Sequence, residues 1–216
     1  MTSSASAGTT EQPASAGAHP APATGRTASR FTSTDIALIA VFAALIAGFA
    51  MTPPIPVGSL GVPITLQTLV IGLTGLTLGP LRGFLAALLY VVLGLIGLPI
   101  FAGFSGGLGV LAGPTAGYLI AFPIFALLAG VVAGWAVKRL TGGKLWAVLF
   151  GGGLLASFLS IHPLGILGIS VKAGIPLSAA FLADLPFWPG DVVKNLVAAS
   201  LALLIHRAFP TILVRR

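Results

Sequence analysis

An oppositely charged pair lies in an otherwise apolar segment near the C-terminal end of the chain. Asp191 and Lys194 occur in the run PGDVVKN at residues 189–195. In a helix, the i, i+3 spacing places both side chains on one face, where each partly neutralises the other. Together they offer a hydrogen-bond acceptor and a donor to a polar ligand. The spacing also fits an arrangement without a ligand, in which the helix N-terminus favours the carboxylate and Lys194 extends outward along its own stem.

A second polar group lies at the start of another apolar segment, in VPITLQT at residues 62–68. Thr65, Gln67 and Thr68 can hydrogen-bond either a ligand or a neighbouring helix. Helix packing is the plainer role for the threonines, whereas Gln67 carries two donors and an acceptor on one side chain. We expect Gln67, with Thr65, to add hydrogen bonds to a ligand held by the charged pair.

Aromatic side chains gather near the ends of the apolar segments. They form either an interfacial belt, which is the plainer interpretation and the one we apply to Trp188, or the wall of an apolar pocket. The pocket interpretation makes Tyr118 a candidate ligand-binding residue. The aromatic residues are Phe101, Phe104, Tyr118, Phe187 and Trp188.

The remaining reactive residue types do not indicate an enzyme or a metal site. His162 has no second histidine or carboxylate at helical spacing, so we expect it to bond a backbone carbonyl. Asp184 and Asp191 are separated by two prolines, which argues against the paired carboxylates of an intramembrane protease. The glycines of 106–113 lack the Gly-Lys-Ser/Thr of a phosphate-binding loop. We therefore expect no catalysis, no metal and no cofactor.

The composition indicates an integral membrane protein. Hydrophobic residues make up 56% of the chain and charged residues only 7%, against about 25% charged residues in soluble domains. No Asp, Glu, Lys or Arg occurs in residues 36–81, 83–137 or 145–171. A spanning helix needs about 20 apolar residues, so two of these stretches are long enough for a pair of helices. The net charge of +7 is spread thinly between apolar segments, which is typical of topology signals and not of a nucleic-acid surface.

The apolar segments predict an all-α membrane domain of six transmembrane helices over residues 34–216. Residues 1–33, rich in Ser, Ala, Thr, Gly and Pro, are predicted to form a disordered cytoplasmic tail. A different count is left open, since the apolar stretch 99–113 could partly re-enter the membrane, where irregular backbone must be buried in protein or line a cavity. The predicted spans are 36–52, 62–80, 81–99, 114–137, 145–169 and 189–209.

The basic residues predict that both termini face the cytoplasm. With the N-terminus inside, only Lys172 lies in an outer loop. The outer loops are then 53–62, 99–113 and 170–188, which are rich in Gly and Pro and suit a lid over a small molecule. The inner basic residues are Arg26, Arg30, Arg82, Lys138, Arg139, Lys144, Arg207, Arg215 and Arg216.

Small residues recur at four-residue spacing in the first and fourth spans. Such faces let helices approach closely, either within the chain or in docking a partner protein. The residues concerned are Ala40, Ala43, Ala44, Ala47 and Gly48 in the first span, and Ala126, Gly130 and Gly134 in the fourth.

Several ordered motifs resemble the BioY family, the biotin-binding S components of energy-coupling factor (ECF) transporters. The resemblance extends from about residue 34 to about residue 209. The fifth span matches weakly, and the N-terminal tail is longer than is usual in the family. The matching motifs are VPITLQTLVIGLTGLTLG at 62–79, GPLRG at 79–83, YVVLGLIGLPIF at 90–101, AGFSGGLGVLAGPTAGY at 102–118 and FWPGDVVK at 187–194.

The resemblance implies a six-helix S-component fold that binds biotin at its outer face. It also implies an energising module of a coupling transmembrane protein and two ATPase subunits, docked on the Ala-rich face of the first helix. The last helix would bind substrate: Asp191 accepting from a ureido N–H, and Lys194 donating to the ureido oxygen or the valerate carboxylate. Tyr90, which opens one matching motif, joins the candidate substrate-binding residues, and loop 53–62 would close over the site.

We therefore expect a multi-pass protein of the cell membrane, in contact with lipid, that takes up biotin. A self-sufficient secondary transporter or channel is the main rival interpretation. Such proteins usually show charged relays or related halves, and neither is found in this chain. Transport of biotin by the chain without an ATPase module is left open.

Overall fold

Helices follow the six predicted apolar segments in order along the chain. The computed structural model describes residues 1–2, 31–56, 58, 60 and 62–213, and the predicted tail lies largely outside these described residues. The six longer helices are α1 Ser33–Ala50, α2 Gln67–Leu78, α3 Pro80–Leu95, α4 Ala116–Ala136, α5 Gly142–Ala173 and α7 Phe187–Ala208.

Local chemistry explains where several of these helices begin. Thr32 caps α1, because its side chain accepts from the Asp35 N–H while the Asp35 carboxylate accepts from the Thr32 N–H. Between α2 and α3, Gly79 adopts a φ of +81°, a conformation that favours glycine, and Pro80 takes the first position of α3. At the other end of the chain, Pro189 lies in the first turn of α7, where a missing N–H is tolerated.

The helices differ in whether they can cross a bilayer. Among the described helices, α1, α4, α5 and α7 are long and apolar enough to do so. Helices α2 and α3 have 12 and 16 residues. At about 1.5 Å per residue, both are shorter than the roughly 30 Å hydrocarbon core. The protein is an all-helical membrane bundle, and the count of six spans stays a prediction.

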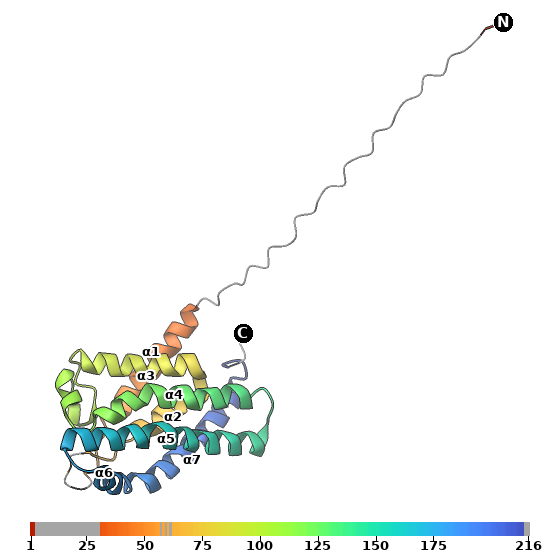
Figure 1. The fold of residues 1–216 in the computed structure, drawn as a ribbon. Coiled ribbons are helices and arrows are strands. Elements are labelled where there is room, and N and C mark those ends of the chain that lie inside the picture. The colour runs from red at the N-terminus through yellow and green to blue at the C-terminus, as the bar shows by residue number, and fades with distance from the viewer. Residues whose placement is uncertain (3–30, 57, 59, 61, 214–216) are drawn as a thin grey trace. The chain divides into compact units, whose positions relative to one another are not determined.

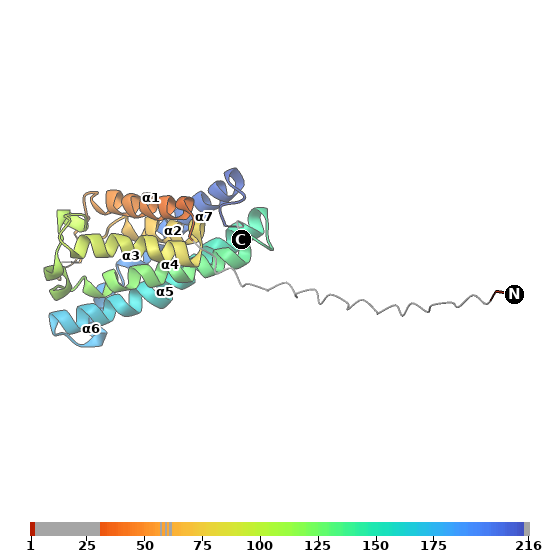
Figure 2. The ribbon, with the colours of Figure 1, turned by 90° about the horizontal axis from the view of Figure 1, so that it is seen from above.

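Close packing of small residues joins α2, α3 and α4. A Cβ atom on Gly75 would overlap the carbonyl oxygen of Ala126, and one on Gly130 would overlap the backbone at Gly79. Figure 2 shows α1, α3, α4 and α5 following one another across the bundle, in agreement with their pairwise contacts. Part of the predicted small-residue pattern of the fourth span therefore packs within the chain, as in other membrane bundles.

The interpretation of 170–188 as an irregular loop is wrong. Helix α5 continues to Ala173, and a further short helix, α6, spans Leu177–Asp184 before α7 begins at Phe187. Gly174, with a φ of +66°, ends α5 in the left-handed conformation, and Pro176 precedes α6. The 13 residues between α5 and α7 (174–186) therefore contain two changes of chain direction, with the short helix α6 between them.

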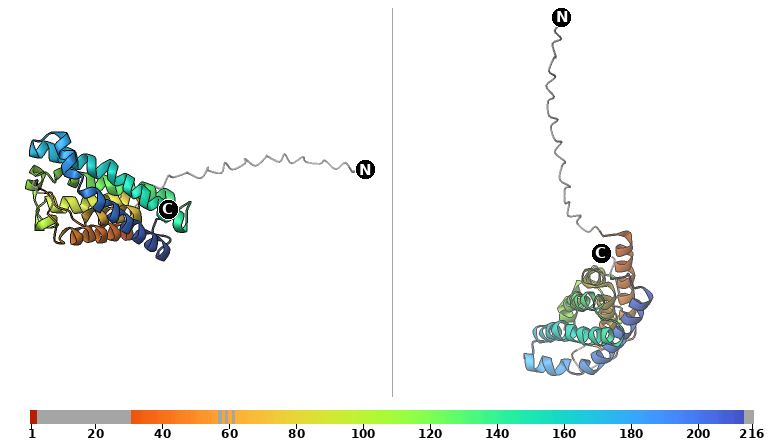
Figure 3. Two further views of the ribbon diagram at one scale, coloured as in Figure 1. Left: turned by 90° about the horizontal axis from the view of Figure 1, so that it is seen from below. Right: turned by 90° about the vertical axis from the view of Figure 1, so that its right-hand side faces the viewer.

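The second predicted outer loop contains two short 3₁₀ helices, η1 Ala102–Phe104 and η2 Leu108–Ala112. Together with α6 they lie at one end of the bundle, and the α4–α5 turn and the C-terminal end of α7 lie at the other (Figures 1 and 3). The predicted outer loops therefore meet at one end, which is named here the loop end.

Candidate functional site

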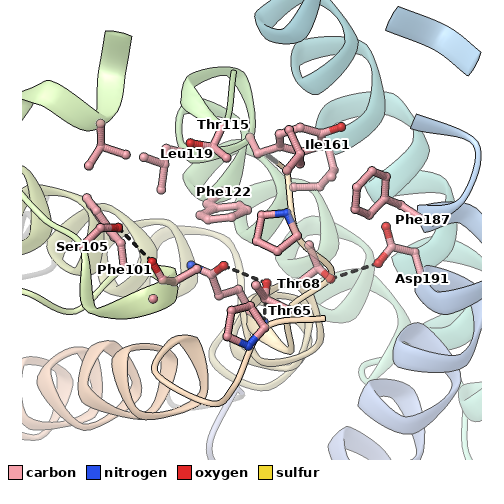
Figure 4. A pocket seen from close by; sticks show the side chains of 18 of the residues that line it. Thr65, Thr68, Phe101, Ser105, Thr115, Leu119, Phe122, Ile161, Phe187 and Asp191 are labelled. Atoms are coloured by element: carbon pink, nitrogen blue, oxygen red, sulfur yellow. Dashed lines mark hydrogen bonds between the residues drawn. The ribbon is translucent and has the colours of Figure 1, made fainter. Parts of the chain in front are cut away.

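A cavity of about 330 Å³ opens at the loop end. Its volume is within the range of about 300–1,000 Å³ that is typical of small-molecule sites. The cavity has a polar wall that includes Thr65, Thr68 and Asp191 (Figure 4). The main apolar residues of the lining are Phe101, Leu119, Phe122, Ile161 and Phe187. Such a site suits a small ligand that combines an apolar body with several hydrogen-bonding groups.

The charged pair lies on the cavity wall. Lys194 Nζ is 2.9 Å from Asp191 Oδ1, and both side chains are buried. Thr68, on α2, donates to the same carboxylate oxygen at 3.0 Å and accepts from Lys194 Nζ at 3.1 Å. The alternative in which Lys194 extends outward is therefore wrong, because α2 supplies a hydroxyl that holds the ammonium group inside the bundle.

Gln67 and Thr65 also line the cavity, and they are bonded to each other. Thr65 Oγ1 donates to Gln67 Oε1 at 2.7 Å, and Gln67 Nε2 donates to the Tyr90 hydroxyl at 2.7 Å. Tyr90 is fully buried on α3 and does not line the cavity. The structure thus places Tyr90 behind Gln67, where it orients the amide and has no direct path to a ligand.

His162 departs from its predicted environment. Its Nδ1 atom is 2.7 Å from Asp184 Oδ2, and its Nε2 atom is 3.5 Å from Asp191 Oδ2. The expectation of a backbone carbonyl partner is wrong, because α6 and α7 bring two carboxylates to a histidine on α5. Helical spacing within one segment cannot reveal partners of this kind.

Asp184 is the residue at this site that sequence reasoning missed. Its carboxylate accepts from the Tyr118 hydroxyl at 2.6 Å and from the Trp188 indole N–H at 2.8 Å, in addition to its contact with His162. Trp188 is thus a half-buried partner of a buried carboxylate, and its place in an interfacial belt stays a prediction. No local signal points to this group, since His162 lies in the middle of a predicted span and Asp184 and Trp188 fall in the predicted loop 170–188.

Two segments of irregular backbone cover the cavity. Ile55 and Ile64 form an antiparallel bridge with N–H···O distances of 2.9 and 2.8 Å, and Pro54, Val62 and Pro63 line the cavity beside it. The second segment includes η1 and contributes further lining. Closure of loop 53–62 over a ligand stays a prediction.

The predicted docking residues lie on different faces of α1. Ala43 is buried in the bundle core, and Ala47 is half-buried against it. Ala40, Ala44 and Gly48 are exposed. The small face that α1 presents outward is therefore formed by Ala40, Ala44 and Gly48.

Comparison with known families gives a match over nearly the whole membrane domain. The sequence model of the BioY family matches residues 23–211. A protein of Rhizobium etli named "Biotin transporter BioY" is 34% identical, over 85% of this chain and 99% of its own length. A protein of Rhodobacter capsulatus with the same name is 41% identical, over 84% of this chain and 98% of its own length.

Solved structures include a similar fold. The crystal structure of "the S-component for biotin from an ECF-type ABC transporter" superimposes with a TM-score of 0.76. The two sequences are 27% identical, and the match covers 82% of this chain and 95% of the other. The likeness therefore extends over most of the helical bundle.

Proposed function

The chain belongs to the BioY family, and from this premise we propose that it is the biotin-binding S component of an ECF transporter, with biotin held in the loop-end cavity. The observation that carries the assignment is the buried Asp191–Lys194 pair on the wall of that cavity. Ionisable groups inside a membrane bundle are rare and mark ligand or ion sites. Here the pair faces an open cavity of small-molecule size.

The chemistry of biotin suits this wall. Its ureido group carries two N–H donors and one carbonyl acceptor, and its fused rings and sulfur are mostly apolar. No hydrogen bond reaches Asp191 Oδ2 among the described residues, so this oxygen can accept from a ureido N–H. Lys194 donates to Asp191 and Thr68 and keeps one further N–H for the ureido oxygen or the valerate carboxylate. Both assignments of that N–H remain open.

Orientation in the membrane follows from the basic residues. Lys172, at the end of α5, is on the loop-end side, and the described basic residues at the opposite end are Arg82, Lys138, Arg139, Lys144 and Arg207. The positive-inside rule then directs the loop end and its cavity outward and both termini to the cytoplasm. Biotin would enter from outside, between the segments that cover the cavity.

Energy would come from partner proteins. No nucleotide-binding motif occurs in the sequence, and the S component in our proposal works with a coupling transmembrane protein and two ATPase subunits. The exposed small face of α1, with Ala40 and Ala44, is the proposed docking surface for the coupling protein. Small residues on a helix surface allow the close helix contact that such docking needs.

Equilibrium binding tests the proposed ligand. Purified protein in detergent is titrated with labelled biotin, and unlabelled biotin, dethiobiotin and thiamine are added as competitors. We expect saturable binding at one site, displaced by biotin but not by thiamine. Dethiobiotin keeps the ureido group and the carboxylate, so it should also compete. Absence of saturable binding, or equal displacement by thiamine, would show that the cavity serves another ligand.

A further inference from the structure

His162 lies between two buried carboxylates that come from different helices. Its Nδ1 atom contacts Asp184 at the end of α6, and its Nε2 atom faces Asp191 in the first turns of α7. The three side chains are at most 3% exposed. Asp191 lines the cavity, whereas His162 and Asp184 do not. The imidazole ring therefore connects the ligand-facing carboxylate to a second carboxylate behind it.

Asp184 is the main buried group that α6 contributes. Apart from Ala180, it is the only fully buried residue of this helix. Its three partners come from other helices: Tyr118 from α4, His162 from α5 and Trp188 from α7. A buried carboxylate is stable only when hydrogen bonds and charges compensate for its desolvation. Asp184 is thus held in one place, and it holds the His162 ring in turn.

The contacts of the His162 ring are directional. Nδ1 faces Asp184 Oδ2 at 2.7 Å, and Nε2 faces Asp191 Oδ2 at 3.5 Å. Nε2 is buried, and it has no hydrogen bond among the described residues. The contact with Asp184 therefore sets the orientation of the ring, and the ring in turn presents Nε2 to the carboxylate of Asp191.

We propose that Asp184 and His162 are positioning residues for the ligand site, with Asp184 orienting the imidazole ring that packs against the carboxylate of Asp191. Helix α6 would then serve to place Asp184 against α5. The identity of the ligand rests on the proposed function, but the linkage itself is a property of the protein without ligand. Neither Asp184 nor His162 touches the ligand.

A double-mutant cycle tests the linkage without any ligand. Asp184→Asn, Asp191→Asn and the double variant are prepared with His162 present and again with His162→Phe, and the midpoint of thermal unfolding is measured in detergent. Groups that share a partner give non-additive effects, whereas independent groups add. We expect non-additivity with His162 and additivity with Phe. Additive effects in both backgrounds would overturn the inference.

Spectroscopy and ligand binding supply two further readouts. In protein labelled with ¹⁵N-histidine, the ring signal of His162 should change with Asp184→Asn and with Asp191→Asn; a signal that changes with neither would contradict the linkage. Biotin affinity should fall about tenfold in Asp184→Asn, a change of the size that one buried charged contact gives. The same substitution should have no further effect once His162 is replaced by Phe.

His206 provides a matched control. It is also a buried histidine, but it lies on α7 and bonds the carbonyl oxygen of Leu76 at 2.9 Å. His206→Asn should leave biotin affinity unchanged, and it identifies the His206 signal among those of the three histidines of the chain. If Asp184→Asn fails to fold, Trp188→Phe replaces it in the cycle, since it removes one hydrogen bond to Asp184 and keeps an aromatic ring. If the native protein does not bind biotin, the proposed function is wrong. The double-mutant cycle without ligand still tests whether His162 links Asp184 to Asp191.

Discussion

Thr68 on α2 donates a hydrogen bond to Asp191 on α7, across a sequence separation of 123 positions, with an Oγ1–Oδ1 distance of 3.0 Å. The same hydroxyl accepts from Lys194. One uncharged side chain therefore connects both members of the charged pair on α7 to α2. The Thr68 hydroxyl helps to keep the pair inside the bundle, since a buried carboxylate and a buried ammonium group need hydrogen-bond partners that offset their desolvation.

Thr68→Val is expected to weaken biotin binding about fivefold to about tenfold, because it removes one donor to Asp191 and one acceptor from Lys194 at nearly constant volume. Binding of labelled biotin measures the effect. Thr74→Val is the matched control: it lies on the same helix, it is buried, and its hydroxyl bonds only the backbone of Val70. Equal affinities of the two variants would show that the Thr68 hydroxyl does not contribute to the site.

Gln67→Ala should weaken biotin binding about tenfold, and Tyr90→Phe by a smaller factor, of about threefold. The Tyr90 hydroxyl accepts from Gln67 Nε2 and donates to the carbonyl oxygen of Ile100, so it orients the amide from behind. The double variant should bind no more weakly than Gln67→Ala alone, because groups acting through one contact are not additive. A double variant whose loss equals the product of both single losses would instead give Tyr90 a role of its own.

Ile55→Pro should accelerate biotin release several-fold with little change in the cavity wall. Proline removes the N–H that Ile55 donates to Ile64 in the bridge beside the cavity. The dissociation of labelled biotin into an excess of unlabelled biotin gives the rate. Ile55→Val keeps the backbone donor and should release biotin at the native rate. Identical rates for all three proteins would show that this segment does not cover the ligand.

Ala44→Trp should abolish most uptake of biotin by cells that contain the coupling protein and the ATPase subunits. A bulky side chain on the exposed small face of α1 would prevent close approach of a partner helix. Binding of biotin by the purified variant should be unchanged. Phe49→Trp, at an exposed position about 140° around the helix from Ala44, is the control. Normal uptake by the Ala44 variant would place the docking surface elsewhere.

Helices and charges were predictable from local patterns, and contacts between helices were not. The apolar segments gave six helices in order, and the pair Asp191 and Lys194 was visible from a spacing of three residues. Helix α6 was missed because its eight residues are too few to show a clear period. Apolar residues lie on the exposed side of α6 as well, so the sequence shows no polar face opposite an apolar face. Without that pattern, the segment between α5 and α7 reads as a loop.

The environment of His162 illustrates the second limit. Its two carboxylates are 22 and 29 positions further along the chain, at His162–Asp184 and His162–Asp191. Only the turns on either side of α6 bring them to the same ring. A search for partners at helical spacing cannot find contacts that depend on how three helices pack, and the role of Tyr90 behind Gln67 was missed for the same reason.

The affinity of purified protein for labelled biotin, compared with that of Asp191→Ala and Lys194→Ala, is the decisive test of the site. Each substitution leaves a buried charge without its partner, and we expect each to reduce affinity at least about tenfold. Ser200→Ala, on α7 but outside the cavity, serves as the control. Native affinity in both charged-pair variants would mean that biotin binds this protein without the Asp191–Lys194 pair.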